Sequence, residues 1–155
     1  MRSGIWILAL AASAMTVSSA LAAPCTMRSL AGVWSLVSVR SAEPGVEEFY
    51  ARAPHEWMRF DPDADYVYVA SNRPKTSLAE IQSSLDEADR MDGVTYRIEW
   101  LEPGRMLIRR NGQPFQVFRC EILERPAADA RVGDLILSAD DGMPMLRRVQ
   151  RRVTR

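Results

Sequence analysis

The chain has 155 residues, 47% of them hydrophobic, and its 20 basic residues are balanced by 20 acidic ones. This length and composition are those of one globular domain without low-complexity segments or repeats. A net charge of zero argues against a polyanionic partner, so we expect no nucleic-acid binding.

Residues 1–22 have the three parts of an export signal peptide. Arg2 is followed by a nearly apolar run at residues 5–14, and residues 20–22 read Ala-Leu-Ala, which is typical of a cleavage site. We predict cleavage after Ala22. The alternative is a retained membrane anchor, but serines and threonines interrupt the apolar run below the roughly 20 residues that a span needs.

Residues 23–155 are therefore predicted to be one periplasmic or secreted domain without a stable membrane span. Export changes how the two cysteines are interpreted, because an oxidising compartment favours a disulfide over a metal site or a catalytic thiol. We predict a bridge between Cys25 and Cys120; two free thiols are the alternative. In the loop-entropy model, a disulfide that closes a loop of about 100 residues stabilises the folded state by roughly 4 to 5 kcal/mol.

The first predicted strand covers residues 32–40, and both of its faces are partly apolar. Gly32 allows the chain to enter the strand closely packed, and Trp34 is placed to close one end of a core. Residues 41–53 lack periodicity and are predicted to be a long loop. This loop carries Phe49 and Tyr50, adjacent aromatic residues that we expect to fold back over the core.

Two short strands follow, at residues 56–60 and 65–71, joined by a turn in which Pro62 presets the backbone. The spacing then changes to that of a helix that begins at Ser77 and ends near Met91. At about 13 residues this helix needs tertiary packing to be stable. We expect it to cover or plug one mouth of the fold.

The rest of the chain is predicted to be strands. The clearest alternation runs over residues 94–101, with one face for the core and one for solvent. Strands at residues 106–110 and 115–123 flank Asn111-Gly112, a strong hairpin signal. Residues 134–139 and 145–152 form a last hairpin. The total is eight strands with one helix between the third and fourth, which favours an up-and-down antiparallel barrel that leaves no open edge.

The chain resembles the bacterial lipocalin-like proteins of the calycin group. The resemblance is carried by Leu30-Ala31-Gly32-Val33-Trp34-Ser35-Leu36-Val37-Ser38, by Met58-Arg59-Phe60-Asp61-Pro62 leading into Asp65-Tyr66-Val67-Tyr68-Val69, and by Gly133-Asp134-Leu135-Ile136-Leu137-Ser138 before Asp141-Gly142. It differs from typical secreted lipocalins by lacking a C-terminal helix and by having one in the middle.

This resemblance implies a mainly β, eight-stranded barrel with structural residues at its closed end. In that group an arginine late in the final strand packs over the tryptophan ring. Arg147, Arg148 and Arg151 compete for this role, and we expect Arg148 to join Gly32 and Trp34.

An eight-stranded barrel is about wide enough to be filled by side chains or to hold one small ligand. We therefore predict, as the leading function, non-enzymatic binding of a small apolar or amphipathic molecule. The alternative is a solid barrel filled by the same side chains. The candidate ligand-binding residues are the aromatic and aliphatic residues of the strand faces, namely Phe60, Tyr66, Tyr68, Tyr96, Ile98, Trp100 and Phe118.

Two other functions remain open. The arginine-rich C-terminus, together with the loop at Phe49 and Tyr50, could dock on an envelope protein. Barrels of this group also host isomerase chemistry, which an inward-facing Glu or Arg with a strongly perturbed pKa would favour.

We expect no cofactor and no metal. The only histidine, His55, lies at a loop–strand junction, where a surface role is commoner than haem ligation or hydrolytic catalysis. Asp61, Asp63 and Asp65 begin like a calcium loop, but Tyr66 stands where that loop requires glycine.

Overall fold

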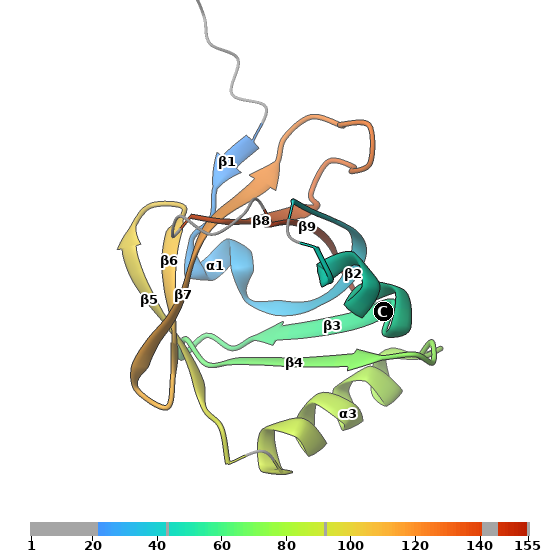
Figure 1. Cartoon of the computed structure of the whole chain (residues 1–155). Coiled ribbons are helices and arrows are strands. Elements are labelled where there is room, and N and C mark those ends of the chain that lie inside the picture. The colour runs from blue at the N-terminus through green and yellow to red at the C-terminus, as the bar shows by residue number, and fades with distance from the viewer. Residues whose placement is uncertain (1–21, 43, 92, 141–145, 155) are drawn as a thin grey trace, which may run out of the picture.

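The computed structural model describes residues 22–42, 44–91, 93–140 and 146–154 (Figure 1). Apart from Ala22, the predicted export signal lies outside the described residues, and it stays a prediction. Among the described residues, none of the helices has the length and apolar character that crossing a membrane requires.

The described chain is mainly β and forms one curled antiparallel sheet. Its hydrogen-bonded path is β4-β3-β2-β9-β8-β7-β6-β5, and the short β1 pairs with β7. The strands are β1 (Ala22–Pro24), β2 (Gly32–Ser41), β3 (His55–Phe60), β4 (Tyr66–Ser71), β5 (Tyr96–Glu102), β6 (Arg105–Arg110), β7 (Gln113–Leu123), β8 (Leu135–Ala139) and β9 (Leu146–Arg152).

The two ends of this path, β4 and β5, meet without forming a ladder. They share an isolated bridge between Asp65 and Arg97, and the Ile98 amide donates to the Ala64 carbonyl at 2.8 Å. The expected closed eight-stranded barrel is therefore wrong, and the sheet is a half-barrel. Beside this junction Ala88 and Val94, from the connection between β4 and β5, line a small pocket with residues of both strands.

In the described part of the chain, three helices accompany the sheet, whereas the sequence predicted one. They are α1 (Met27–Leu30), α2 (Val46–Arg52) and α3 (Leu78–Met91). The predicted helix is α3, and the Ser77 side chain caps it by accepting from the Glu80 amide at 3.1 Å. With β1 counted, α3 lies between the fourth and fifth strands.

Helix α3 packs on the outside of the curl, under β3 and β4 (Figure 1). Its buried residues Ile81 and Leu85 form a cluster with Val33, Trp57 and Val67. These three strand residues point outward, so the expectation that the helix covers or plugs a mouth is wrong. Outward apolar residues on β2, β3 and β4 provide a surface that a short amphipathic helix needs for stability.

The two helices that the sequence analysis missed lie at opposite ends of the interior. Helix α1 is a single turn held by reciprocal capping between Thr26 and Ser29. Helix α2 replaces part of the predicted loop and begins after Gly45, whose φ of 90° is in the left-handed region that favours glycine. Both helices are too short to show a helical periodicity of apolar residues in the sequence.

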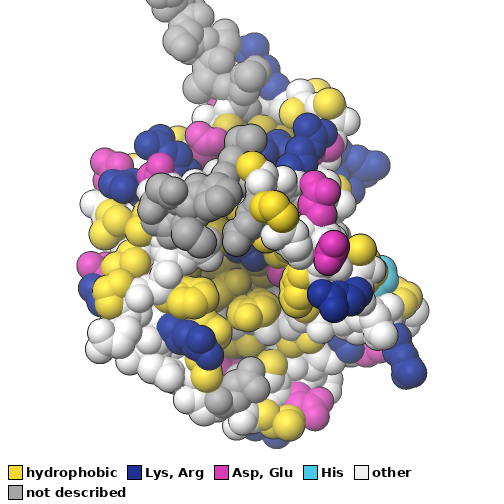
Figure 2. All heavy atoms as spheres, in the orientation of Figure 1, with side chains coloured by type: hydrophobic (Ala, Val, Ile, Leu, Met, Phe, Trp, Pro, Cys, Tyr) yellow, Lys and Arg dark blue, Asp and Glu magenta, His cyan; other side chains and the backbone are white. Residues whose placement is uncertain are grey.

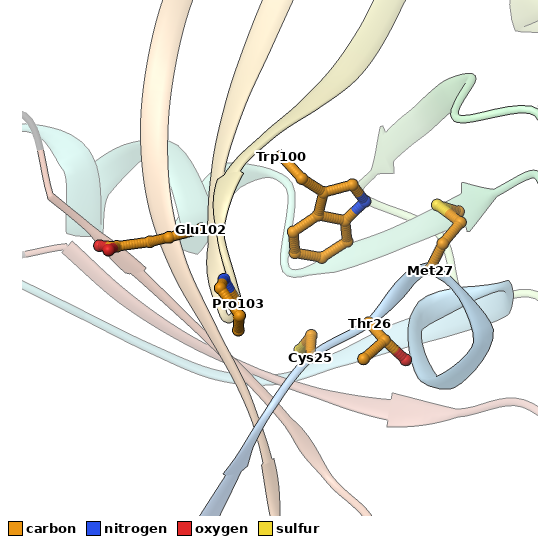
Figure 3. A pocket seen from close by; sticks show the side chains of 6 residues that line it. All are labelled: Cys25, Thr26, Met27, Trp100, Glu102 and Pro103. Carbon is orange, nitrogen blue, oxygen red and sulfur yellow. The ribbon is translucent and has the colours of Figure 1, made fainter.

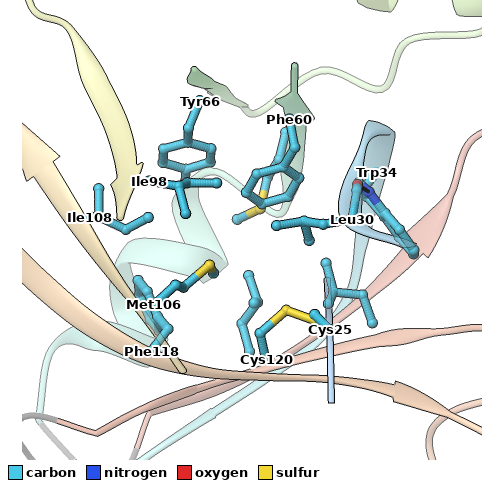
Figure 4. Packing of buried hydrophobic residues seen from close by; sticks show 13 residues of the cluster. Cys25, Leu30, Trp34, Phe60, Tyr66, Ile98, Met106, Ile108, Phe118 and Cys120 are labelled. Carbon is cyan, nitrogen blue, oxygen red and sulfur yellow. Dashed lines mark hydrogen bonds between the residues drawn. A yellow bond between two sulfur atoms is a disulfide. The ribbon is translucent and has the colours of Figure 1, made fainter. Parts of the chain in front are cut away.

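One end of the half-barrel is closed by a disulfide and by packed side chains, and we call it the closed end (Figure 4). Cys25 and Cys120 form the predicted bridge, with Cα atoms 5.4 Å apart. Leu30 is fully buried next to it, and the Trp34 indole donates to the Leu30 carbonyl at 2.7 Å. This end therefore holds the N-terminal segment against β7.

The arginine over Trp34 is Arg152, and the expectation of Arg148 is wrong. The Arg152 guanidinium lies 4.3 Å from the centre of the indole, and it donates at 2.6 Å to the carbonyls of Ala31 and Ser29. Pairing decides the choice, because Trp34 and Arg152 are cross-strand partners in β2 and β9. Gly32 has a φ of 126°, which favours glycine, and a Cβ on it would lie 2.5 Å from Arg152 Nη1.

Candidate functional site

A cavity of about 210 Å³ lies inside the curl of the sheet, at the end opposite the disulfide. Figure 2 shows apolar side chains at the bottom of a hollow in this face of the molecule. The cavity is formed by α2 and by side chains of six strands. Its lining residues are Phe49, Tyr50, Glu56, Tyr66, Tyr68, Tyr96, Ile108, Phe115, Gln116, Phe118, Leu146 and Arg148.

Aromatic rings make up most of one wall. Tyr66 and Tyr68 share a face of β4 because alternate strand residues point the same way, and their rings stack with centres 5.9 Å apart. Tyr96 from β5 meets both of them edge-on at 5.8 Å, and Phe115 lies edge-on to Tyr96 at 5.9 Å. The wall therefore spans the gap where the sheet does not close.

A buried ion pair also borders the cavity. Glu56 of β3 is 2% exposed, and Arg148 of β9 is 7% exposed. Arg148 Nη1 donates to Glu56 Oε1 at 3.3 Å, and Gln150 Nε2 donates to the same oxygen at 2.9 Å. The Tyr50 hydroxyl of α2 donates to Glu56 Oε2 at 3.2 Å. One carboxylate thus joins β3, β9 and α2.

The electrostatics of this cluster follow from its burial. Burial by itself would lower the pKa of Arg148, but the charge of Glu56 and the nearby Tyr66 and Tyr50 outweigh it, so this pKa is raised. Burial, followed by the charge of Glu56, raises the pKa of Tyr50 to about 12. Burial also raises the pKa of Tyr66. All three groups keep one protonation state near neutral pH.

Two buried polar atoms of the cluster have no hydrogen-bond partner among the described residues. They are Arg148 Nε and Gln150 Oε1. The Arg148 guanidinium lies 5.0 Å from the centre of the Phe118 ring. Arg148 lines the cavity and Gln150 does not. Arg148 therefore lines the cavity with other atoms of its side chain, while its unmet Nε donor is itself fully buried.

The structure brings together four of the seven predicted ligand-binding residues, Tyr66, Tyr68, Tyr96 and Phe118. The others lie elsewhere. Phe60 and Ile98 are buried in the core behind the cavity (Figure 4). Trp100 lines a separate surface pocket.

That second pocket is larger, about 360 Å³, but it is a weaker candidate. It is an open apolar surface between β5 and the segment before α1 (Figure 3). Glu102 points away from Trp100 there, so no polar groups converge on the space. A ligand site needs a few converging polar groups to orient the ligand. The pocket is lined by Cys25, Thr26, Met27, Trp100, Glu102 and Pro103.

Neither Glu56 nor Arg148 was predicted from the sequence to line a ligand site, and Arg148 was expected to be structural. Glu56 has the same parity on β3 as the buried Met58 and Phe60, and Arg148 has the same parity on β9 as Gln150. A charged residue on an otherwise buried face is the signal that would have found Glu56. Arg148 lies among other arginines, so parity alone does not single it out.

The remaining candidates for chemistry lie away from the cavity. The His55 ring stacks on Trp57, with centres 5.9 Å apart, on the outward-facing side of β3. Asp61 pairs with Arg59, and Asp65 pairs with Arg97. No group of three or more potential metal-ligating residues was found in the part of the chain that the structure describes.

The arginines of β9 are bound within the chain. Arg147 Nη1 donates to Asp129 Oδ2 at 3.0 Å, and Arg151 Nη2 donates to Asp134 Oδ2 at 2.8 Å. Arg155, the last residue of the arginine cluster, lies outside the described residues.

No protein-family model matches this chain, and neither a curated protein nor a solved structure does. The assignment of a function therefore depends on the geometry of the cavity.

Proposed function

We propose that this protein binds a small amphipathic molecule in the cavity between α2 and the open side of the half-barrel. The observation that carries the proposal is the cavity itself, which has aromatic walls and one polar side at Glu56 and Arg148. An apolar hollow with a few fixed polar groups is the usual form of a small-molecule site.

The size of the cavity favours a carrier over a solid barrel. Its volume of about 210 Å³ exceeds the roughly 150 Å³ that holds one benzene in an engineered protein cavity. Filled barrels avoid voids of this size because each lost contact lowers stability. The exposed edges of Phe49, Tyr68 and Phe115 extend the apolar surface to the mouth.

Arg148 lines the cavity and has a perturbed pKa, but the direction of that shift favours binding over isomerase chemistry. A general acid or base works best when its pKa is near the operating pH. Arg148, Tyr50 and Tyr66 all have raised pKa values, which move these groups further from neutrality. Glu56 already accepts three hydrogen bonds, so little of its carboxylate is free to take a proton from a ligand.

We further propose that residues 23–155 form one exported lipocalin-like domain. The disulfide supports this proposal because such bonds persist in oxidising compartments. The curled antiparallel sheet and the pairing of Trp34 with a late arginine support the resemblance. Docking through the C-terminal arginines is less well supported, since Arg147 and Arg151 already have partners.

The proposal can be tested in two steps. Native mass spectrometry of protein purified without denaturation would detect a co-purifying molecule. Amide NMR spectra recorded with phenol, indole and octanoic acid would then locate binding. We expect shifts concentrated on the residues that line the cavity.

Two variants provide a matched comparison. Gln116→Trp puts a large ring into the cavity wall, whereas Gln113→Trp makes the same change at an exposed position of the same strand. We expect Gln116→Trp to abolish the shifts and Gln113→Trp to keep them. The proposal fails if no probe moves the cavity amides and no molecule co-purifies.

A further inference from the structure

We propose that Gln116 recognises the ligand, and that the ligand is an uncharged single-ring compound with a carboxamide or another adjacent pair of hydrogen-bond donor and acceptor. This inference rests on the proposed binding function and names the chemistry of its ligand. Three observations support it: the Gln116 side chain points into the curl of the sheet, its amide group is free, and the charges of the cavity wall cancel.

The direction of the Gln116 side chain follows from the pairing of β6 and β7. Gln116 is the cross-strand partner of Ile108, and cross-strand partners lie on the same face of a sheet. Ile108 belongs to the buried core, and so does Phe118, which is two residues further along β7. All three residues line the cavity. The polar side chain of Gln116 therefore lies on the inner face, among apolar neighbours.

A β-bulge places an aromatic ring next to Gln116. Ile108 of β6 pairs with Gln116 of β7. The next residue of β6, Arg109, pairs with Pro114, so Phe115 is an extra residue of β7. Bulges redirect side chains and are frequent beside functional sites. Phe115 and Gln116, although adjacent in the chain, consequently both line the cavity.

The carboxamide of Gln116 is available to a ligand. It makes no hydrogen bond with any residue that the structure describes. The fully buried polar atoms without a partner in the described chain are Arg148 Nε and Gln150 Oε1, and the half-buried Gln116 contributes neither of its amide atoms to them. Solvent therefore reaches Gln116 Oε1 and Nε2. A carboxamide donates and accepts, so a ligand carboxamide can pair with it through two hydrogen bonds.

The cavity wall has no uncompensated charge. Among the described residues that line it, Glu56 and Arg148 are the only charged ones, and they pair with each other at 3.3 Å. The other lining residues are aromatic or aliphatic, apart from Gln116. An ionised group on the ligand would lose hydration there without gaining an opposite charge. An uncharged ligand avoids that cost.

The volume and the walls of the cavity favour one aromatic ring. About 210 Å³ exceeds the roughly 150 Å³ that holds benzene, which leaves room for a small substituent. Tyr68, Tyr96 and Phe115 form a series of edge-on contacts at 5.8 and 5.9 Å, a spacing that suits a further ring. We therefore expect a compound of about the size of benzamide.

Three probes of nearly the same shape separate these properties. Benzamide has a ring and a carboxamide, acetophenone replaces the NH₂ donor by a methyl group, and benzoate carries a negative charge. Titrations of the native protein followed by NMR would give the three dissociation constants. We expect benzamide to bind about fivefold or more tightly than acetophenone, because one further hydrogen bond is formed. Benzoate should bind most weakly of the three.

Two leucine variants provide a matched comparison. Gln116→Leu removes the amide and keeps a side chain of similar size, whereas Gln113→Leu makes the same change at an exposed position of the same strand. We expect the ratio of the acetophenone and benzamide dissociation constants to fall about fivefold or more in Gln116→Leu. The ratio should stay native in Gln113→Leu. Taking the ratio cancels any change in the cavity that affects both probes alike.

The NMR signals of the Gln116 side-chain NH₂ group give a direct readout on the native protein. Benzamide should shift these signals, and the NH₂ signals of Gln113 should not move. Because only the native protein is used, the result holds even if Gln116→Leu does not fold.

The outcomes distinguish this inference from the proposed function. If acetophenone binds the native protein as tightly as benzamide, if the ratio is unchanged in Gln116→Leu, or if benzamide leaves the Gln116 signals unmoved, the cavity binds ligands but the inference about Gln116 is wrong. If benzoate binds most tightly, the ligand is an anion and the inference is also wrong. If none of the three binds, and the phenol, indole and octanoic acid probes fail as well, both proposals fail.

Discussion

Arg148 and Arg152 lie four residues apart on β9, and they differ in how far their hydrogen-bond donors are satisfied. Arg152 lies over Trp34 at the closed end, and its guanidinium donates to two backbone carbonyls. Arg148 lies over Phe118 beside the cavity, and its Nε has no partner within the described chain. At one end of the half-barrel the arginine is therefore satisfied internally, whereas at the other end it keeps a buried donor without a partner among the described residues.

The largest expected effect concerns the closed end. The double variant Cys25→Ser/Cys120→Ser should lower the free energy of unfolding by about 4 to 5 kcal/mol, because the bridge closes a loop between residues 95 positions apart. Denaturant unfolding monitored by tryptophan fluorescence would measure it. Probe binding at the cavity should persist wherever the variant is folded. Equal stability with and without the bridge would contradict this role.

The next effect concerns the cavity end. Glu56→Leu leaves the buried Arg148 charge without its partner and should cost about 3 kcal/mol of stability. The Glu56→Gln/Arg148→Met variant is the control, since removing both charges is expected to cost much less. Calorimetric unfolding would compare the two. Similar losses in both variants would show that the ion pair is not the cause.

A smaller effect is expected from Arg152→Met, which should cost about 1 kcal/mol. The residue is largely exposed, so its contacts to Trp34 and to the carbonyls of Ser29 and Ala31 are partly screened by water. Ligand affinity should be unchanged because Trp34 is at the other end. A loss of ligand binding in this variant would show that the two ends are coupled.

The smallest effect is a dependence on alkaline pH. The pKa of Tyr50 is raised to about 12, and its unfolded value is 10.0. The folded state holds this proton more tightly, so the contribution is complete below pH 10 and is lost as pH rises towards 12. The Tyr50→Phe variant should lose less stability over this range.

The absorbance of tyrosinate provides an independent check. The chain has four tyrosines, and burial is the largest cause of a raised pKa at Tyr50, Tyr66 and Tyr68. Native protein should therefore ionise fewer tyrosines at pH 10.5 to 11 than denatured protein. Identical titrations in the two states would contradict the burial of the aromatic wall.

The strand order and the central helix could be predicted from local patterns, and the disulfide could be predicted from the two cysteines and the expected export. Alternation and turn residues locate strands, and a capping serine with a 3.6-residue stripe locates α3. Helices α1 and α2 could not be predicted, because seven residues or fewer show too little periodicity. The choice of Arg152 over Arg148 could not be made either, since it depends on the register of β2 against β9, which pairs Trp34 with Arg152 and Val39 with Arg148.

The candidate site was only partly predictable. The alternation on β4 and β5 placed Tyr66, Tyr68 and Tyr96 on one face, which is a local property. Trp100 has the same parity on β5 as Tyr96, yet it lies at a separate pocket because the strand extends past the end of the cavity. The alternation of residues along a strand predicts which face of the sheet a side chain lies on. It does not predict where along the strand the cavity ends.

The sequence by itself determined which residues can face inward, where the chain turns and that two cysteines can pair. These properties depend on neighbours within a few positions, or on chemistry that the compartment sets. Only the tertiary structure decided that the sheet stays open between β4 and β5 and that Glu56 meets Arg148, 92 positions away. Such contacts depend on the curl and register of the whole sheet, to which every strand contributes.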